Sequence, residues 1–315
     1  MNKNGVAVYI LRNVKISYSK LRSFFDGTVF YRYPNTFYNK FYKIIIGRER
    51  YEYKAFTHHL GYSPDLRNPK SFNEKLAHKK LFDFNPLLPI IADKWRVRDY
   101  VSGKVGDEIL NKVYQVTSDS KSVQWSSLPE SFIVKGTHGS GSKFILPVYD
   151  KSTIEENELR MHIDRILQLR FGFATNEWWY CKIPPRVMIE ELLVDDIFRT
   201  PLDYKYFVFN GKVEIIQVHL DRYSNHSISY YDREWNEISI RDYVPVSEPL
   251  ERPPLLSEMM SIAERLAEGF DFLRVDLYCI NNKIIRFGEL TICPRAGWLR
   301  FTPREADYFL GSLWK

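Results

Sequence analysis

Two acidic residues near the carboxyl end of the chain have a spacing that suits a metal site. Asp276 and Glu289 lie in two segments rich in apolar residues, Leu273–Ile280 and Lys283–Leu290, which are separated by Asn281-Asn282. Two strand-like segments joined by such a pair are typical of a β-hairpin. Because a hairpin places its strands side by side, the spacing predicts that the two carboxyl groups are neighbours, about 7–8 Å apart at Cα.

The register of this hairpin decides which side chains share a face. A two-residue turn pairs Arg274 with Glu289 and leaves Asp276 opposite Phe287. Since side chains alternate along a strand, Arg274, Asp276 and Glu289 then project from one face. Carboxylates among apolar residues repel each other unless a cation neutralises them, and Mg²⁺ prefers one or two carboxylates together with substrate phosphates. The pattern favours a magnesium site, and an ordinary Arg274–Glu289 ion pair beside a solvated Asp276 is the alternative.

A glycine-rich segment in the middle of the chain is the second candidate site. Gly136-Thr-His-Gly139-Ser-Gly141 connects two predicted strands, Ser131–Lys135 and Lys143–Val148. Glycine lets backbone N–H groups approach a phosphate, because no Cβ stands in the way, and Lys135 adds positive charge. The loop leads from a strand into a strand and lacks the GK[ST] ending, so it supports neither a P-loop nor a Rossmann domain. An ordinary flexible hairpin is the alternative.

Alternating helices and strands carry these residues. Ser71 and Glu74 form a capping-box pattern that predicts a helix start. The other predicted elements are a helix opened by Pro86 and Pro89 that runs to about Val101, a helix over residues 152–170, a strand over Pro185–Leu193, a hairpin of Asp203–Phe209 and Lys212–His219 around Asn210-Gly211, and a helix after Pro253-Pro254 that closes at Gly269. Hairpins with helices between them predict an α+β fold with antiparallel sheets.

The composition limits the function classes. The 315 residues are 44% hydrophobic and 27% charged and include three cysteines, which is typical of a globular protein without a disulfide framework or a CxxC zinc site. No apolar run approaches the length of a membrane span, and the amino terminus lacks the pattern of a secretory signal. We therefore expect a cytoplasmic protein.

The first 54 residues carry all of the excess positive charge, since the rest of the chain is slightly acidic. They hold eleven Lys or Arg and three Asp or Glu, in a chain of net charge +6. Residues 8–25 have the periodicity of an amphipathic helix, and aromatic residues crowd into 30–42. Two interpretations remain: a helical extension docked on the body, or a peripheral contact of residues 1–54 with the inner face of the cytoplasmic membrane, where each basic residue near anionic lipid adds about 1 kcal/mol. No nucleic-acid-binding motif accompanies the charge, so we expect no nucleic-acid partner.

Taken together, the motifs between about Asn68 and Pro303 resemble the ATP-grasp superfamily, and within it the TupA-like branch associated with teichuronopeptide and bacterial surface-polysaccharide biosynthesis. The matching motifs are NPKSFNEK at 68–75, DKWRVRDYV at 93–101, FIVKGTHGSG at 132–141, EELL at 190–193, DYKYFVFNGK at 203–212, RVDLY at 274–278 and FGELT at 287–291. Their order and spacing carry the resemblance, which implies the ATP-grasp fold, with antiparallel sheets that enclose a nucleotide cleft.

The resemblance also implies roles for individual residues. The residues that would contact ATP are Lys94, Lys135, Gly136, His138, Gly139, Ser140, Gly141, Glu190, Glu191, Leu193, Asp203 and Lys205, with Glu190 or Glu191 facing the adenine amino group and Asp196 as a candidate ribose ligand. Asp276, Glu289 and Thr291 would bind Mg²⁺, Lys135 and Arg274 would act in catalysis, and Arg295, Trp298 and Arg300 would contact the acceptor. Many ATP-grasp ligases have Asn where this chain has Thr291, so the number of metal ions stays open.

We expect the chain to comprise four segments, the first from its charge and periodicity and the other three from the resemblance. They are a basic, aromatic-rich helical extension (1–60), a helical part of the ATP-grasp unit (61–130), a glycine-loop lid (131–195) and a metal- and nucleotide-binding part (196–315).

The implied activity is that of an ATP- and Mg²⁺-dependent ligase, which activates a carboxylate as an acyl phosphate and joins it to an amine. The expected substrates are a saccharide or uronic-acid acceptor and an amino acid or other amine or carboxylate, so that the product is an amide on a bacterial surface polysaccharide or its precursor. The alternatives are a glycosyltransferase of polysaccharide biosynthesis, although Asp195-Asp196 and Asp203 make no convincing DxD motif, and a nucleotide-binding scaffold without turnover.

Overall fold

The computed structural model describes residues 37–196, 198, 200–220, 226–242, 244–246 and 248–315. The helix predicted over residues 8–25 and most of the aromatic-rich stretch lie outside the described residues. Contacts within the chain divide it into two units, residues 1–64 and 65–315. The described part of the first unit consists of two helices, α4 (Phe37–Ile46) and α5 (Arg48–Leu60).

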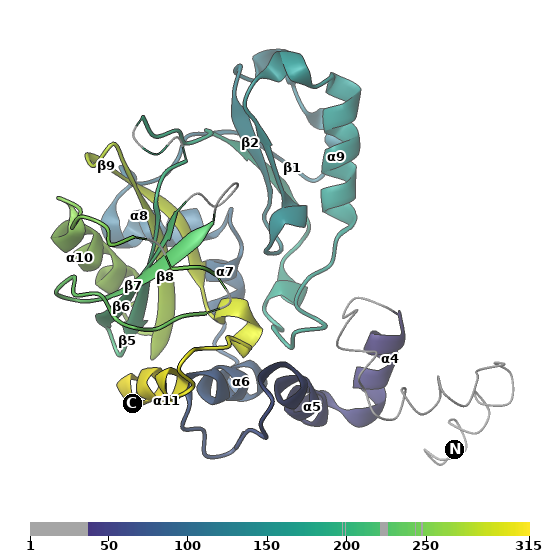
Figure 1. Cartoon of the computed structure of the whole chain (residues 1–315). Coiled ribbons are helices and arrows are strands. Elements are labelled where there is room, and N and C mark those ends of the chain that lie inside the picture. Colours follow the sequence, from purple (N-terminus) through teal and green to yellow (C-terminus); the bar gives the residue numbers. More distant parts are fainter. Residues whose placement is uncertain (1–36, 197, 199, 221–225, 243, 247) are drawn as a thin grey trace, which may run out of the picture. The chain divides into compact units, whose positions relative to one another are not determined.

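The larger of two sheets in the second unit carries both predicted carboxyl-terminal hairpins. Its strand order is β7-β6-β5-β8-β9, and all neighbouring strands are antiparallel (Figure 1). The strands are β5 (Asp203–Phe209), β6 (Lys212–Leu220), β7 (Ser227–Asp232), β8 (Phe272–Ile280) and β9 (Ile284–Thr291). Asn210 and Gly211 join β5 to β6 with φ of 49° and 80°, the left-handed values of a tight turn, so this hairpin is confirmed. No pattern in the sequence predicted β7.

Helices cover the larger sheet. α10 (Leu256–Leu266) packs on β5, β6 and β8 and buries Met259, Ala263 and Leu266, which recur at helical spacing. α6 (Phe72–Phe82) inserts one ring, Phe72, into an aromatic cluster with Phe207, Phe209, Phe272, Phe301 and Trp314. The carboxyl-terminal helix α11 (Glu305–Leu313) packs on α6. These contacts place α6 directly beside the sheet that carries the acidic residues.

The capping box at the start of α6 is confirmed. The Ser71 hydroxyl accepts from the Glu74 N–H at 3.1 Å, and the Glu74 carboxylate accepts from the Ser71 N–H at 3.0 Å. The two contacts satisfy backbone donors that the first turn of a helix leaves unpaired.

The smaller sheet has the order β1-β4-β2-β3 and carries the glycine-rich loop. Its strands are β1 (Val113–Thr117), β2 (Phe132–Gly136), β3 (Ile145–Val148) and β4 (Val187–Glu190). α9 (Glu156–Gln168) lies along this sheet and buries Leu159, Ile163 and Ile166 against a core separate from that of the larger sheet (Figure 1). The predicted lid began at residue 131. Because β1 pairs with β4, the sheet itself begins earlier in the chain, at Val113.

The single helix predicted from Pro86 to about Val101 is wrong. Two helices, α7 (Leu88–Ala92) and α8 (Val97–Val105), are separated by a turn. Asp93 causes the break, because its backbone is extended (φ −80°, ψ 111°) and its carboxylate accepts from the N–H of Trp95 at 3.0 Å. Such side-chain acceptance competes with a continuous helix. The break leaves Lys94 in the turn between the helices.

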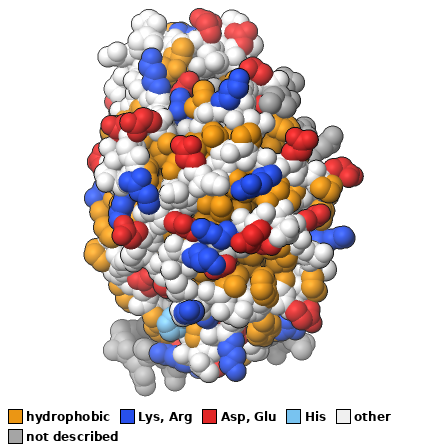
Figure 2. Space-filling view, turned by 90° about the vertical axis from the view of Figure 1, so that its left-hand side faces the viewer, with side chains coloured by type: hydrophobic (Ala, Val, Ile, Leu, Met, Phe, Trp, Pro, Cys, Tyr) orange, Lys and Arg blue, Asp and Glu red, His pale blue; other side chains and the backbone are white. Residues whose placement is uncertain are grey.

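Short 3₁₀ helices connect these elements in the described part of the chain: η1 (Ser120–Ser122), η2 (Trp125–Ser127), η3 (Ser142–Phe144), η4 (Lys151–Thr153), η5 (Tyr180–Lys182) and η6 (Pro294–Gly297). No helix within the described residues is long and apolar enough to cross a membrane. On the face shown in Figure 2, basic and acidic side chains are interspersed with apolar ones, and neither sign forms a continuous patch on that face.

Candidate active site

The β8–β9 hairpin brings the two predicted metal ligands together. Asp276 lies directly opposite Glu289, and Arg274 lies opposite Thr291. The predicted diagonal arrangement, in which Asp276 faced Phe287, is therefore wrong by two residues. The predicted common face is confirmed, because the Arg274 guanidinium contacts both carboxylates.

Two local features cause the change of register. Ile280 pairs with Ile284, one residue beyond the expected partner, and Gly288 is an extra residue that bulges between Phe287 and Glu289. A Cβ at position 288 would lie 2.9 Å from the backbone oxygen of Asp276, closer than such atoms approach. Glycine is therefore the residue that fits this bulge, and the bulge is what turns Glu289 toward Asp276.

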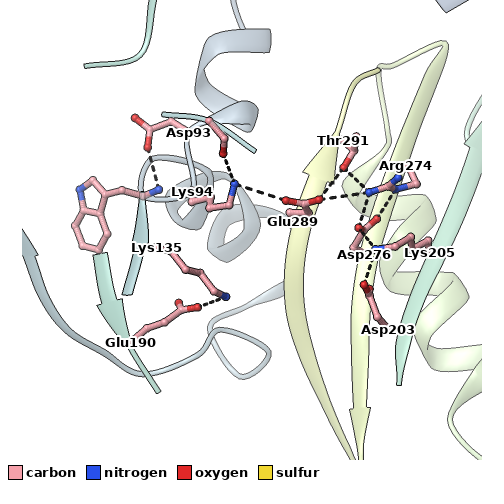
Figure 3. Close-up of polar contacts among 12 residues, drawn as sticks. Asp93, Lys94, Lys135, Glu190, Asp203, Lys205, Arg274, Asp276, Glu289 and Thr291 are labelled. Atoms are coloured by element: carbon pink, nitrogen blue, oxygen red, sulfur yellow. Dashed lines mark hydrogen bonds and ion pairs between the residues drawn. The ribbon is translucent and has the colours of Figure 1, made fainter. Parts of the chain in front are cut away.

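A compact cluster of charges surrounds Asp276 (Figure 3). Arg274 donates from Nε to Oδ1 and from Nη2 to Oδ2 of Asp276, each at 2.7 Å. Lys205 on β5 lies opposite Asp276 in the sheet, and its Nζ is 2.6 Å from Asp276 Oδ2 and 2.6 Å from Asp203 Oδ2. Lys205 and Asp203 are two residues apart on β5 and therefore share one face of the sheet. Of these two predicted ATP contacts, Lys205 lines a cavity and Asp203 lines neither of the two cavities described below.

Glu289 connects this cluster to the turn between α7 and α8. Lys94 Nζ lies 3.6 Å from Glu289 Oε2 and donates to the backbone oxygen of Gly139 at 2.8 Å. On the other side, Glu289 Oε1 lies 3.4 Å from Arg274 Nη2 and accepts from the Thr291 hydroxyl at 3.3 Å. Figure 3 shows the resulting chain of polar contacts from Lys94 across both strands. Through Lys94, these contacts connect the larger sheet with the glycine-rich loop of the smaller sheet.

Burial sets the electrostatics of the cluster. Burial raises the pKa of the Asp276 carboxyl above its usual value; Arg274 and Lys205 oppose this rise, while Asp203 and Glu289 add to it. Burial also tends to lower the pKa of the Arg274 guanidinium, but Asp276 and Glu289 outweigh it, so that this pKa is raised and the guanidinium stays charged. The cluster thus holds its cationic side chains in place beside acids in a site with little solvent.

The first cavity, of about 390 Å³, lies where the glycine-rich loop meets β8 and β9. The cations Lys94 and Lys135 and the loop residues 139–142 form part of its lining, together with Asp276 and Glu289. The remaining wall is largely apolar and comprises Ile133, Phe144, Ile145, Pro147 and Tyr278. A cavity lined by lysines, a glycine-rich loop and apolar side chains suits a ligand that has both phosphates and an aromatic ring.

The glycines of the loop serve two different purposes. A Cβ at Gly136 would lie 2.7 Å from Ile166 and from Phe144, and a Cβ at Gly139 would overlap the Phe144 ring. These two glycines therefore allow the loop to pack tightly on Phe144, rather than serving only the predicted approach of a phosphate. Gly141 has φ of 96° and open space around its Cα, and it lines the cavity.

His138 does not lie where the sequence placed it. Its ring is 2% exposed, stands edge-on to Phe144 at 5.1 Å, and lines neither of the two cavities described in this section. Burial lowers the pKa of this imidazole. The predicted contact with phosphate is therefore corrected: His138 packs behind the loop as a neutral group.

The predicted adenine-binding strand is also arranged differently. Glu190 is buried and its carboxylate forms an ion pair with Lys135 at 2.5 Å (Figure 3). Neither Glu190, Glu191 nor Leu193 lines the first cavity. Asp196, the candidate ribose ligand, instead exchanges two hydrogen bonds of 2.8 Å with Asn281 at the tip of the β8–β9 hairpin.

The second cavity, of about 540 Å³, adjoins the first. Its lining includes two of the predicted acceptor residues, Arg295 and Trp298, whereas Arg300 is exposed outside it. The other side chains of chemical interest are Glu177, Tyr180, Gln217, His219, His226, Asp242 and Cys293. None of these was predicted as a site residue, because they lie on five separate segments that only the fold brings together.

Three residues line both cavities: Ser140, Gly141 and Glu289. Arg274 and Lys205 line the second cavity, and their partner Asp276 lines the first. The charged cluster therefore stands at the boundary between the cavities. The two cavities therefore adjoin at Ser140, Gly141 and Glu289.

The acid pair fits the chemistry of Mg²⁺. Within the described part of the chain no three His, Cys, Asp or Glu side chains gather as a metal site. Mg²⁺, however, is usually bound by one or two carboxylates, with phosphates and water completing the shell. Asp276 and Glu289 supply two carboxylates to the first cavity, and Thr291 adds a hydroxyl next to Glu289.

Comparison with known proteins adds independent information. A family model described as TupA-like ATPgrasp matches residues 74–315. Among solved structures, the chain is similar to the ATP-grasp ligase PsnB complexed with minimal precursor (17% identity, TM-score 0.37, 66% of this chain and 55% of that chain), to D-cycloserine synthetase DcsG (14%, 0.43, 72% and 70%) and to the D-alanine-D-alanine ligase from Coxiella burnetii (15%, 0.40, 71% and 57%). The chain thus spans a little over half of the PsnB chain. None of the curated proteins compared with it matches.

Proposed function

The chain belongs to the TupA-like ATP-grasp family, and from that premise we propose that it is an ATP- and Mg²⁺-dependent ligase that joins a carboxylate to an amine. The observation that carries this proposal is the arrangement of two cavities that meet at Glu289, Ser140 and Gly141. One cavity has the lining expected for a nucleotide, and the other has room and polar groups for a second substrate.

In this proposal the first cavity holds ATP. Lys94 and Lys135 neutralise phosphate charge, and the terminal phosphate lies beside Ser140 and Gly141, which line both cavities. Lys135 is held by Glu190, so nucleotide phosphate and Glu190 compete for its ammonium group. The apolar wall that includes Ile133 and Tyr278 takes the adenine ring.

The proposed reaction has two steps. An oxygen of the substrate carboxylate attacks the terminal phosphorus of ATP, the bond to the bridging oxygen breaks, and an acyl phosphate and ADP form. The amine then attacks the acyl carbon, the C–N bond forms, inorganic phosphate leaves and the amine nitrogen loses a proton. Phosphoryl transfer requires alignment and charge neutralisation more than covalent help from the protein.

Residues of the chain fit both requirements. Arg274 is fixed by its two hydrogen bonds to Asp276 and lines the second cavity, where it stabilises the negative charge that the acyl phosphate carries. Tyr180 also lines this cavity, and burial together with Glu177 and Glu289 raises its pKa well above the usual value, so its hydroxyl remains a donor. Asp276 and Glu289 would hold Mg²⁺, which when bound neutralises the phosphate oxygens.

We propose further that the substrates include a saccharide or uronic-acid acceptor, with an amide on a bacterial surface polysaccharide or its precursor as the product. Membership of the TupA-like family supports this class, and the 540 Å³ of the second cavity is large enough for a sugar unit. The basic segment 1–54 supports a peripheral membrane contact at the site of such precursors; removing residues 1–55 should abolish binding to anionic liposomes, and equal binding would refute the contact.

The test of the proposed function is ADP release. The purified chain is incubated with Mg·ATP and a panel of carboxylate and amine pairs that includes uronic acids and amino acids, and ADP and the amide are measured. We expect ADP release that requires both substrates and is lost in the Arg274→Met variant. ADP release without an amide would indicate phosphorylation only, transfer of a sugar from a nucleotide-sugar would favour a glycosyltransferase, and nucleotide binding without turnover would favour a scaffold.

A further inference from the structure

A seven-residue segment, Cys293–Leu299, forms much of one wall of the second cavity. Its residues Cys293, Pro294, Arg295, Ala296, Trp298 and Leu299 all line the cavity. Within it, Arg295 (φ 51°, ψ 30°) and Ala296 (φ 57°, ψ 24°) both have left-handed backbone conformations. Residues other than glycine, asparagine and aspartate adopt such conformations rarely, and two in succession require support from the surrounding structure. Something must therefore fix this turn.

Helix α6 lies beside the turn and contacts it at three points. Asn73 donates to the Leu299 carbonyl at 2.8 Å and accepts from the Leu299 N–H at 3.0 Å. Leu76 lies so close that a Cβ on Gly297 would be 3.0 Å from it. Lys80 donates to the Ala296 carbonyl at 2.6 Å. Residues 73, 76 and 80 share one face of a helix, so α6 presents a continuous stripe to the turn.

Lys80 makes the contact nearest to the strained backbone. The Ala296 carbonyl that it binds belongs to one of the two left-handed residues, and the same ammonium group lies 4.7 Å from the ring centroid of Trp298. A charge-assisted hydrogen bond to a carbonyl and a cation–π contact each fix the group they touch. Lys80 thus holds the turn on both sides of Gly297.

We propose that Lys80 is a positioning residue of the second cavity: it holds the Cys293–Leu299 turn in the conformation that places Arg295 and Trp298 in the cavity wall. The proposal rests on the proposed function only in naming this cavity as the substrate site. It assigns a role to the part of α6 that follows the NPKSFNEK motif. That part of the helix lines neither cavity.

The neighbouring residue Lys79 provides a matched control. Lys79 is a buried lysine on the same helix, but it forms ion pairs with Asp83 at 2.8 Å and with Asp271 at 2.5 Å and lies 5.9 Å from the Trp314 ring. It does not line either cavity. Loss of Lys79 removes a comparable buried charge without touching the turn.

Two cysteines report on the turn and on the fold. Cys293 is 3% exposed, lies at the start of the turn and would be uncovered if the turn opened. Cys279 is equally buried, but it lies within β8 in the core of the larger sheet. Cys181 is exposed, so it reacts first and shows that the reagent is active. Alkylation of each cysteine by iodoacetamide can be followed by peptide mass spectrometry.

The experiment compares alkylation rates in the full chain. We expect Lys80→Met to raise the rate at Cys293 by about tenfold or more through local opening, with the rate at Cys279 unchanged. Lys79→Met should leave the rate at Cys293 as in the wild type. Lys80→Arg keeps a cationic donor and should largely preserve protection. The double variant Lys80→Met/Ala296→Gly should regain part of the protection of Cys293 from alkylation, because glycine adopts the left-handed conformation without strain.

Two results would overturn the proposal. One is unchanged protection of Cys293 in Lys80→Met, and the other is a parallel rise at Cys293 and Cys279, which would make Lys80 a residue of the general fold. With a substrate pair that releases ADP, Lys80→Met should raise the KM for the second substrate and leave the KM for ATP unchanged. If the wild type releases no ADP with any pair, the proposed function fails, while the alkylation rates still decide the role of Lys80.

Discussion

The charge state of Asp276 depends on its neighbours, because burial alone raises the pKa of its carboxyl. Arg274 binds both of its oxygens and Lys205 binds one, so a buried carboxylate is matched by two cations. Removing one cation would leave a buried, poorly compensated charge, which is costly. The same two cations line the second cavity, and for this reason the acid pair and the proposed transfer site form one unit.

His138 gives a prediction for the pH dependence of stability. Burial lowers the pKa of its imidazole below the usual value of about 6.5, so the unfolded chain binds this proton more readily than the folded chain. The contribution of His138 is therefore fully present above pH about 6.5 and is lost as the pH falls through that value toward the lower folded pKa. The free energy of unfolding in urea should fall between pH 7 and pH 5.5.

The His138→Gln variant isolates this effect. It should lose part of the fall in unfolding free energy over the same pH range, whatever its stability at pH 7. The variant His162→Gln, at a partly exposed position on α9, serves as the control and should retain the full fall. An identical pH dependence in the wild type and in His138→Gln would contradict the neutral, buried role assigned to His138.

At the scale of elements, one bulge decides the geometry of the acid pair. Gly288 shifts the register so that Glu289 faces Asp276, and no space for a Cβ exists at this position. The Gly288→Ala variant must move the backbone of β8 or β9, which should cost about 1–3 kcal/mol of unfolding free energy and weaken Mg·ADP binding. Urea unfolding and calorimetry measure the two effects.

Gly103 offers the matched control for this substitution. It lies in α8 with no heavy atom within 4 Å of an added Cβ. The Gly103→Ala variant should have the wild-type free energy of unfolding or one up to about 1 kcal/mol higher, because a helix interior favours alanine over glycine. If Gly288→Ala were as stable as the wild type and bound Mg·ADP equally well, the bulge would not define the site.

The elements also show which features a sequence reveals. The hairpins were predictable because Asn210-Gly211 and Asn281-Asn282 are strong turn formers, and the shared face of the acids follows from strand alternation. The register was not predictable, because the bulge at Gly288 depends on how closely the backbone of β8 approaches this position in the folded chain. The α7–α8 break was missed because one side-chain acceptor, Asp93, overrides an otherwise helical pattern.

The Cys293–Leu299 turn shows the same dependence on tertiary contacts. Two left-handed residues other than glycine cost about 1–2 kcal/mol each, which no local sequence pattern compensates. Compensation comes from Asn73 and Lys80, more than 200 positions away in the chain. Arg295 and Trp298 could be predicted as acceptor contacts only through the family resemblance, and Arg300, predicted with them, lies outside the cavity.

At the scale of the whole second unit, the antiparallel α+β class was predictable, and the division of labour between two sheets was not. The smaller sheet supplies Lys135 and the glycine-rich loop, and the larger sheet supplies Asp276, Glu289 and Arg274. Lys94 connects them through its contacts with Gly139 and Glu289. The second cavity draws on segments from Ser140 to Leu299, so its lining emerges only when the sheets are assembled.

In the proposed function, the carboxylates at the boundary of the two cavities bind the magnesium ion of a nucleotide. Glu289 is the better residue for its test, because about 30% of its side chain is exposed and its loss disturbs the fold less than loss of Asp276. Isothermal calorimetry of ADP binding, with Mg²⁺ and with EDTA, compares the wild type with Glu289→Gln.

We predict that Mg²⁺ strengthens ADP binding to the wild type by about tenfold or more and that Glu289→Gln largely abolishes this gain while the folded signal in circular dichroism is unchanged. Wild-type binding that is indifferent to Mg²⁺, or the same gain from Mg²⁺ in Glu289→Gln, would contradict the account.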